Sequence, residues 1–417
     1  MKLGVLVYEY PPKIVGGLGT YAAEITRKFV LLDHDVTVFT MNDDNRTLPT
    51  REIWRGIEIH RPLHIDISDS LPDVIAEDIK KWGMGGRHLF SKILVYNYLS
   101  AAKLVNDLIR KENFKYDMVV AHDWLSAISG ITVKRELDLP FAFHVHSTEK
   151  GRTLGNGSEV VSNIELHGAK AADLIVTVSY AMKDELMKLG FPKDKIGVCY
   201  NGVDEEKYNP KAVEAEKIRA LRESYGLTEE DLMILFIGRL VGVKGVDRLI
   251  MSMPHVLQKK PNAKLVIVGL GDLQDYITNL VRTMKLQESV KFRFEFIPEE
   301  ERILHYAACD VAVFPSLYEP FGIVVLEAMS MERPVVVGAA GVSGMREIVI
   351  PCGDEQCGYH VNPSNPTDIA WGITSALENP EKTGWLGLNG RKRVLNEFTW
   401  NKIAERTISL YEKTING

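Results

Sequence analysis

Short apolar runs alternate with longer amphipathic runs along most of the chain. Several short runs are almost continuously hydrophobic, such as residues 265–268 and 335–337, which is typical of strands buried on both faces of a parallel sheet. The longer runs have helical periodicity, and in residues 246–257 the apolar side chains recur on one stripe. This alternation predicts α/β units joined by right-handed crossovers.

The predicted strands are too many for one compact sheet. They cover residues 2–8, 35–40, 117–121, 141–146, 173–179, 195–200, 233–238, 264–269, 290–294, 310–315 and 334–338. A polar segment with turn residues at both ends, 201–210, divides them into two nearly equal halves. Residues 52–61 also resemble a strand. We therefore expect an α/β fold with two doubly wound, Rossmann-like domains.

Composition and charge exclude several classes of protein. The 417 residues are 45% hydrophobic and 25% charged, so the chain can bury large cores and is not globally disordered. A net charge of −6 argues against a nucleic-acid partner bound through bulk positive charge. No apolar run reaches about 18 residues, so no integral membrane span is expected. The N-terminal apolar stretch is too short for a signal peptide, which makes a cytoplasmic protein the expectation.

The four cysteines do not suggest a metal site. Cys199 and Cys309 lie in apolar sequence and are interpreted as small core residues. Cys352 and Cys357 share one loop, with no second Cys/His pair nearby to complete a zinc site. Two ordinary loop thiols are favoured over a loop disulfide, and both interpretations stay open.

The residues that follow the strands are the candidates for function, because ligands of doubly wound sheets bind at the carboxyl ends of strands. After the first strand, the backbone N–H groups of Gly16, Gly17 and Leu18 open a helix and could receive phosphate. A tight turn that needs glycine explains the same residues about equally well. After the strand at 233–238, Arg239 and Lys244 stand among glycines, and two fixed cations suit a diphosphate.

A second acidic and glycine-containing segment follows the strand at 310–315. Glu319 precedes a helix, and Glu327 lies on that helix in apolar sequence, so it is expected to be buried and hydrogen-bonded. Its partner could be a nearby arginine or backbone amide, or a pair of sugar hydroxyls. Pro320 and Gly322 shape the helix entry, whose first N–H groups could bind an anion.

Histidines mark the end of the strand at 141–146. Strand alternation places His144 and His146 on one face, and the charged side chains that follow include Arg152. One strand earlier, His122 and Asp123 form a second polar cluster in the same layer.

Together these features resemble the retaining nucleotide-sugar glycosyltransferases of the GT-B fold, over essentially the whole chain. The motifs that carry the resemblance are Gly16-Gly17, Gly238-Arg239 with Lys244-Gly245, Glu319-x7-Glu327, and the segments 200–204 and 341–348. The segments 122–124 and 146–152 look most like the glycogen and starch synthase branch and its sucrose-synthase-like relatives. One departure is that Lys13 stands one residue further from Gly16 than in the Lys-x-Gly-Gly motif of glycogen synthases, which leaves its role open.

The resemblance implies an architecture and a reaction. The two domains, 1–200 on the acceptor side and 201–395 for the donor, would face a central cleft, and the C-terminal helix in 396–417 would cross back to the first. The reaction would move a hexose, most simply glucose, from a UDP- or ADP-sugar to an α-glucan or other glycan acceptor. A small-molecule, lipid or polysaccharide acceptor is the alternative, and a nucleotide-sugar epimerase or a glycan phosphorylase is a further one.

The resemblance also assigns roles to residues. Arg239 and Lys244 would hold the donor diphosphate, Glu319 and His146 the transferred sugar, and Glu327 the ribose. The N–H groups of Gly16, Gly17 and Leu18, and those of Phe321, Gly322 and Ile323, would help to bind donor phosphate or sugar. Lys13, Asp123 and Arg152 would be acceptor or sugar contacts.

Charge considerations suggest the mechanism. Negative charge grows on the leaving diphosphate in the transition state of glycosyl transfer. Asp33-His34-Asp35 is the one Asp-x-Asp-like segment considered, but it precedes a strand and is interpreted as a turn. Fixed cations and a helix N-terminus are therefore expected to replace a metal ion, so no metal and no cofactor is expected. No carboxylate is obviously placed as a covalent nucleophile, and front-face attack by the acceptor is favoured.

Overall fold

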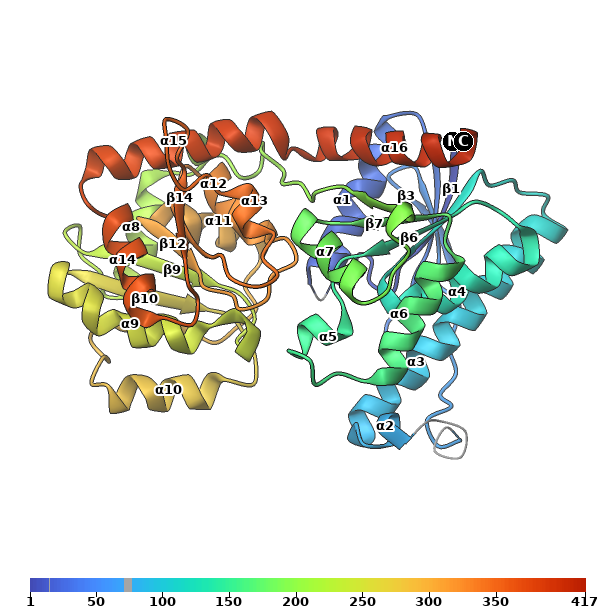
Figure 1. The fold of residues 1–417 in the computed structure, drawn as a ribbon, viewed down its shortest axis with the longest axis horizontal. Coiled ribbons are helices and arrows are strands. Elements are labelled where there is room, and N and C mark those ends of the chain that lie inside the picture. The colour runs from blue at the N-terminus through green and yellow to red at the C-terminus, as the bar shows by residue number, and fades with distance from the viewer. Residues whose placement is uncertain (15, 71–76) are drawn as a thin grey trace. The chain divides into compact units, whose positions relative to one another are not determined.

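The alternating pattern folds into two separate α/β units, each built on its own twisted sheet (Figure 1). The computed structural model describes residues 1–14, 16–70 and 77–417. The first unit comprises Met1–Tyr200 and Trp400–Gly417, and the second comprises Asn201–Thr399. The prediction of two doubly wound, Rossmann-like sheets is confirmed. In the described part of the chain, no helix is both long enough and apolar enough to cross a membrane.

The sheet of the first unit has the strand order β3-β4-β2-β1-β5-β6-β7-β8. Every neighbouring pair is parallel except β3 with β4. The strands are β1 (Lys2–Leu6), β2 (Asp35–Phe39), β3 (Arg51–Trp54), β4 (Ile57–His60), β5 (Met118–His122), β6 (Phe141–Val145), β7 (Leu174–Thr177) and β8 (Ile196–Val198). The central strands β5 and β6 are buried along their whole length, as expected for a sheet covered on both faces.

Helices connect these strands. They are α1 (Gly17–Leu31), α2 (Glu77–Lys80), α3 (Gly83–Ala102), which continues as a π-helix (Lys103–Lys111), α4 (Asp123–Leu137), α5 (Glu149–Arg152), α6 (Glu159–Ala171), α7 (Tyr180–Lys188), a 3-10 turn (Lys193–Lys195) and α16 (Trp400–Asn416).

The second sheet is wholly parallel, with the order β11-β10-β9-β12-β13-β14. Its strands are β9 (Leu232–Ile237), β10 (Ala263–Val268), β11 (Val290–Arg293), β12 (Val311–Phe314), β13 (Val335–Gly338) and β14 (Gly358–Val361). Its helices are α8 (Ala215–Ser224), α9 (Val246–Lys259), α10 (Gln274–Thr283), α11 (Glu299–Ala308), α12 (Ile323–Ser330), α13 (Met345–Ile348), α14 (Pro366–Ala376) and α15 (Pro380–Glu397), with 3-10 turns at Pro210–Ala212 and Gly242–Lys244.

Two strand predictions need correction. The single strand-like segment 52–61 is a hairpin of β3 and β4, because Arg55 and Gly56 both adopt positive φ (52° and 81°) and form a tight turn. The edge strand β14 has no counterpart in the prediction. It contains Gly358 and the polar His360, so it lacks the continuous apolar run that marks the central strands.

The helix α16 belongs to the first unit although it follows the second in the sequence. Its side chains Trp400, Ile403 and Tyr411 are buried in one core with Leu3 and Val5 of β1. Figure 1 shows it in red beside α1, with which it packs.

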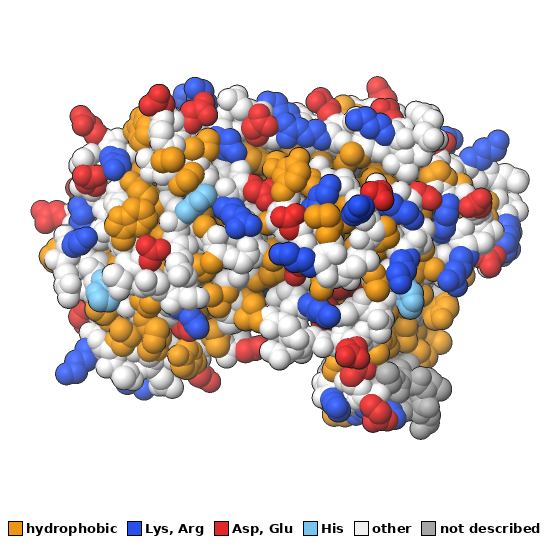
Figure 2. All heavy atoms as spheres, in the orientation of Figure 1, with side chains coloured by type: hydrophobic (Ala, Val, Ile, Leu, Met, Phe, Trp, Pro, Cys, Tyr) orange, Lys and Arg blue, Asp and Glu red, His pale blue; other side chains and the backbone are white. Residues whose placement is uncertain are grey.

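Charged side chains of both signs are mixed on the surface. On the face drawn in Figure 2, basic and acidic side chains are intermingled on both units. All four cysteines are free, so Cys352 and Cys357 are two thiols, as favoured over a disulfide; Cys352 is exposed, whereas Cys357 is buried.

Candidate functional site

Each sheet has one point where its strand order reverses, and the candidate residues lie at those points. In the first sheet, β1 separates β2 from β5; in the second, β9 separates β10 from β12. Ligands of doubly wound sheets bind outside the carboxyl ends of the strands at such points. The loops after β1 and β5, and those after β9 and β12, are therefore the candidate ligand-binding loops.

In the second unit, the loops after β9 and β12 bring Lys244 and Glu319 together. The Lys244 ammonium donates to the Glu319 carboxylate, and the two side chains are 19% and 12% exposed. The Leu317 N–H donates to the carbonyl of Val243 at 2.7 Å, which ties one loop to the other. Gly245 has φ +67°, and a Cβ there would lie 2.2 Å from the Pro315 carbonyl oxygen. Only glycine allows this close approach of the two loops.

The backbone around Glu319 is held on both sides. Its N–H donates to Val342 at 3.0 Å, and its carbonyl accepts from Gly344 at 2.9 Å. Arg239, on the same loop as Lys244, is exposed and forms no ion pair with any described residue. A paired lysine and an available arginine thus stand at one strand edge, which suits a ligand with two phosphates.

The entry of α12 lies next to this pair. Gly322 has φ +106°, and a Cβ there would lie 2.8 Å from Met345 Cγ, so glycine is required. Phe321 is buried against Phe398. The helix begins at Ile323, and in its first turn the N–H of Val325 donates to the Gly322 carbonyl at 3.0 Å.

Glu327 is held by side chains of the protein itself. Its carboxylate accepts from the hydroxyls of Tyr208 (3.1 Å) and Tyr306 (2.9 Å) and pairs with Arg302 at 3.4 Å. The Glu327 side chain is only 6% exposed. Of the partners that the sequence left open, the arginine is therefore present, joined by two tyrosines. Burial and the Glu327 charge hold the pKa of both tyrosines well above the usual range, so they remain donors.

In the first unit, β5 and β6 bring His122, His144 and His146 together. His122 and His144 face each other in the strand register, and the Nδ1 of His122 lies 3.1 Å from the Nε2 of His146. The Nε2 of His144 lies 2.7 Å from the hydroxyl of Tyr411 in α16. Burial lowers the pKa of all three imidazoles, and repulsion between them adds to this for His122 and His144. The cluster is therefore neutral at pH 7.

Asp123 follows His122 and orders the chain at His146. Its carboxylate accepts from the backbone N–H of His146 at 2.7 Å, and its own φ is +53°. Its side chain is therefore engaged with the backbone.

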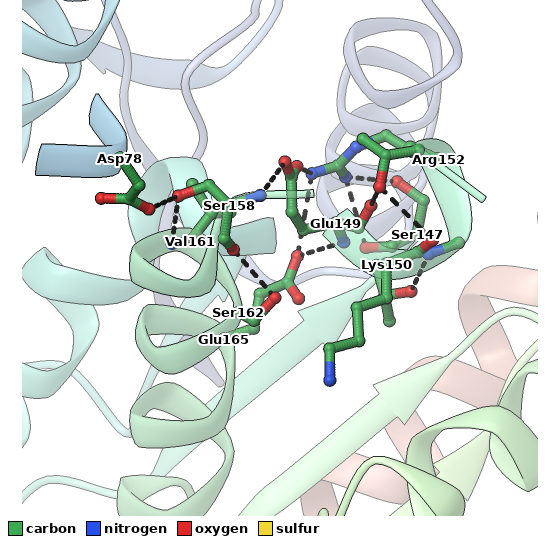
Figure 3. Close-up of polar contacts among 12 residues, drawn as sticks. Asp78, Ser147, Glu149, Lys150, Arg152, Ser158, Val161, Ser162 and Glu165 are labelled. Atoms are coloured by element: carbon green, nitrogen blue, oxygen red, sulfur yellow. Dashed lines mark hydrogen bonds and ion pairs between the residues drawn. The ribbon is translucent and has the colours of Figure 1, made fainter. Parts of the chain in front are cut away.

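Arg152 lies in a polar network after β6 (Figure 3). Its guanidinium donates to Ser147 Oγ at 2.7 Å and to Glu149 at 3.0 Å, and lies 3.7 Å from Glu165. Burial raises the pKa of Glu165 to about 8, an effect that Arg152 opposes. Lys150 points away from this network in Figure 3. Arg152 is half-buried, and the Glu149 carboxylate balances its charge.

The glycine loop after β1 is bound to its surroundings. Gly16 donates to Glu9 at 3.2 Å, and α1 begins at Gly17, so Leu18 lies in its first turn. Lys13 pairs with Asp44 at 3.2 Å, and Lys92 pairs with the same carboxylate at 2.7 Å. Hydrogen bonds from the two lysines lower the pKa of Asp44 to about 2.

Sequence reasoning missed the residues that surround these positions. The Glu327 partners Tyr208, Arg302 and Tyr306 come from the junction and from α11, and no motif announces them. The placement of Tyr21 and Tyr411 against the histidines was also missed. Alternation did place His144 with His146, and the strand pattern placed His122 in the same layer.

Comparison with known proteins matches both halves of the chain to families. Residues 217–393 match the family described as Glycosyl transferases group 1, and residues 15–207 match Glycosyltransferase Family 4.

Individual relatives cover nearly the full length. An uncharacterized glycosyltransferase of Methanocaldococcus jannaschii is 33% identical over 416 residues, covering 99% of this chain and 98% of the relative. A glycogen synthase of Mycobacterium tuberculosis is 28% identical, covering 99% of this chain and 94% of the relative. The structure of sucrose-phosphate synthase from Thermosynechococcus elongatus superimposes with a TM-score of 0.79 at 23% identity, covering 100% of this chain and 99% of that one.

Proposed function

Because the chain belongs to the group 1 glycosyltransferases of the GT-B fold, we propose that it transfers a hexose from a nucleotide-diphosphate sugar with retention of configuration. Glucose is the proposed sugar, and an α-glucan is the proposed acceptor. The observation that carries the proposal is the Lys244–Glu319 pair at the strand-order reversal of the second sheet.

In this proposal, the cations of the second unit hold the donor diphosphate. Arg239 offers a planar fork for phosphate oxygens, and Lys244 offers a compact charge. When the donor binds, phosphate oxygens compete with Glu319 for the Lys244 ammonium, and the carboxylate becomes available to hydroxyls of the sugar. The first-turn N–H groups of α12 add a favourable dipole for the same anion.

The reaction breaks the bond between the sugar C1 and the β-phosphate oxygen, whose electron pair stays on the leaving diphosphate. The acceptor hydroxyl attacks C1 from the face that the diphosphate leaves, and its proton passes to a phosphate oxygen. Lys244 and Arg239 neutralise the charge that develops on the diphosphate, so the reaction should need no metal ion. His146 of the first unit is proposed to hydrogen-bond the transferred sugar.

The similarity to a glycogen synthase at 28% identity supports an α-glucan acceptor. One observation favours a second candidate, a smaller or different acceptor. Lys13 departs from the Lys-x-Gly-Gly spacing of glycogen synthases, and its ammonium is engaged with Asp44. In that alternative the donor chemistry is the same and only the acceptor differs.

The test is a panel of UDP- and ADP-sugars, each with and without glycogen or maltooligosaccharides. Release of nucleoside diphosphate that depends on an acceptor, and an α-linked product from an α-linked donor by NMR, would support the proposal. Lys259→Ala, which changes an exposed lysine of the same unit, is the matched control for Lys244→Ala. A β-linked product, or no diphosphate release with any donor, would refute it.

A further inference from the structure

The three histidines of the first unit form a cluster whose chemistry goes beyond holding a sugar. One ring nitrogen from each of His122, His144 and His146 lies within 4.8 Å of the other two. Sheet register produces this grouping, because His122 and His144 are cross-strand partners and His146 follows two residues later on the same face. The strands β5 and β6 therefore fix His122 and His144, and His146 stands at the first position after β6.

The protonation state of the cluster suits a metal ion. A histidine binds a metal through the lone pair of a neutral imidazole, and protonated histidines cannot bind. Burial lowers the pKa of all three rings and so disfavours the protonated forms. His122 and His144 are each 2% exposed, whereas His146 is half-buried and gives the cluster access to solvent.

The geometry needs little change to accept an ion. Ligand nitrogens about 2.1 Å from a tetrahedral Zn²⁺ lie about 3.4 Å from each other. His122 Nδ1 and His146 Nε2 are already 3.1 Å apart, and a ring nitrogen of His144 lies within 4.8 Å of a ring nitrogen of each. The Tyr411 hydroxyl, 2.7 Å from His144 Nε2, supplies the kind of outer hydrogen bond that orients a metal-bound histidine.

We propose that His122, His144 and His146 form a binding site for a divalent transition-metal ion of the Zn²⁺ type, and that an ion bound there inhibits transfer. Imidazole nitrogens favour Zn²⁺, Ni²⁺ and Cu²⁺ over Mg²⁺ and Ca²⁺, which prefer oxygen ligands. Inhibition follows because the ion occupies the His146 imidazole that would contact the sugar. This second part rests on the proposed function, whereas the metal site does not.

Direct metal binding is the first test. Full-length protein is freed of metal with a chelator and titrated with Co²⁺, whose visible absorption reports nitrogen coordination, and Zn²⁺ is counted by elemental analysis. We expect one ion per chain. His122→Gln and His144→Gln should each weaken binding at least tenfold, whereas His255→Ala, which removes an exposed histidine of α9, should leave it unchanged.

Two outcomes would overturn the metal site. One is the absence of a cobalt absorption band in the unaltered protein, which needs no variant to fold. The other is unchanged binding in both glutamine variants while His255→Ala abolishes it, which identifies the ion as a surface contaminant. Tyr411→Phe should fold and weaken binding by a smaller factor than either histidine change.

Inhibition is tested separately in protein that transfers sugar. Zn²⁺ at a concentration that fills the site should lower turnover at least tenfold, excess chelator should restore it, and Mg²⁺ should have no such effect. A filled site with unchanged turnover would refute the inhibitory role while leaving the metal site intact. Failure of the transferase assay itself would not alter the cobalt result.

Discussion

Each unit contains a buried polar cluster, the three histidines in the first and the Glu327 group in the second, and the two clusters differ in charge. In the first unit, burial favours the neutral form of three imidazoles, and His144 contacts the hydroxyls of Tyr21 and Tyr411. In the second, the Glu327 carboxylate is balanced by Arg302 and by two tyrosine donors. A neutral cluster avoids the cost of burying charge, whereas a charged one depends on every partner.

This difference determines which change each cluster should tolerate. Burial alone would lower the pKa of Arg302, but the Glu327 charge raises it, so Arg302 stays protonated. Mild acid protonates the three histidines more readily in the unfolded chain, where their pKa lies near 6.5, than in the fold, where burial lowers it. We therefore expect mutation to destabilise the Glu327 cluster more than a change of pH does. For the histidine cluster we expect acid to destabilise the fold more than a single substitution does.

The largest expected effect is loss of the Arg302 partner. Arg302→Met leaves Glu327 as a buried charge without its cation, which should cost about 3–5 kcal/mol of unfolding free energy. Urea denaturation at pH 7.5 measures it. The double variant Arg302→Met/Glu327→Leu removes both charges and should recover much of the loss. A loss below about 1 kcal/mol would mean that the pair is solvated like a surface ion pair.

The pair Lys244–Glu319 in the same unit should behave differently, because we propose that it binds the donor. Lys244→Ala should raise the barrier to transfer by about 3 kcal/mol, a hundred-fold or more in kcat, with little change in melting temperature. Steady-state kinetics measure the effect on kcat, and thermal melts measure the effect on stability. Glu319→Gln should likewise lower kcat with little change in melting temperature.

Glu327→Gln should raise donor KM if its carboxylate also holds ribose, and should lower only the melting temperature if it does not.

The next largest expected effect is the loss of stability that acid causes through the histidine cluster. The folded pKa of each ring is lowered, so its contribution to stability is complete above pH 6.5 and is lost as pH falls. Each ring that stays neutral costs up to about 1.4 kcal/mol of unfolding free energy per pH unit below 6.5. Urea denaturation at pH 7.5, 6.0 and 5.0 should show the unfolding free energy falling with pH. In His144→Gln the unfolding free energy should fall less steeply with pH. Equal slopes in the two proteins would contradict neutral burial of His144.

The smallest effect concerns the tyrosine of α16. Tyr411→Phe removes the 2.7 Å hydrogen bond to His144 and should cost about 1 kcal/mol at pH 7.5. Differential scanning calorimetry can measure this loss. Tyr276→Phe, which alters a half-exposed tyrosine of α10 in the second unit, is the control and should be neutral. An equal loss of stability in both variants would show that the hydrogen bond to His144 does not stabilise the fold.

The fold could be predicted from the sequence because its central strands are almost continuously apolar. That pattern identified both sheets, and the fold class is confirmed. It did not reveal β14, whose Gly358 and His360 break the apolar run, nor the turn at Arg55 that splits one apparent strand into two. Short edge strands carry weak patterns, because one side of each is open to solvent.

The candidate site could be predicted only in part, for a related reason. Residues after strands can be selected from sequence, since topology sends ligands to those positions. Which side chains touch depends on strand order. Lys244 meets Glu319 because β9 lies beside β12, and Glu327 meets Tyr208 across more than a hundred residues. These contacts between residues distant in sequence can be identified only from the folded structure.

The place of α16 in the first unit bears on how the protein forms during synthesis. The ribosome releases the second unit as one uninterrupted segment, so that unit can fold as soon as it emerges. The first unit appears earlier but must wait for Trp400, Ile403 and Tyr411 before its core is complete. A nascent first unit therefore exposes apolar surface throughout translation of the second, and chaperones have that interval in which to bind it.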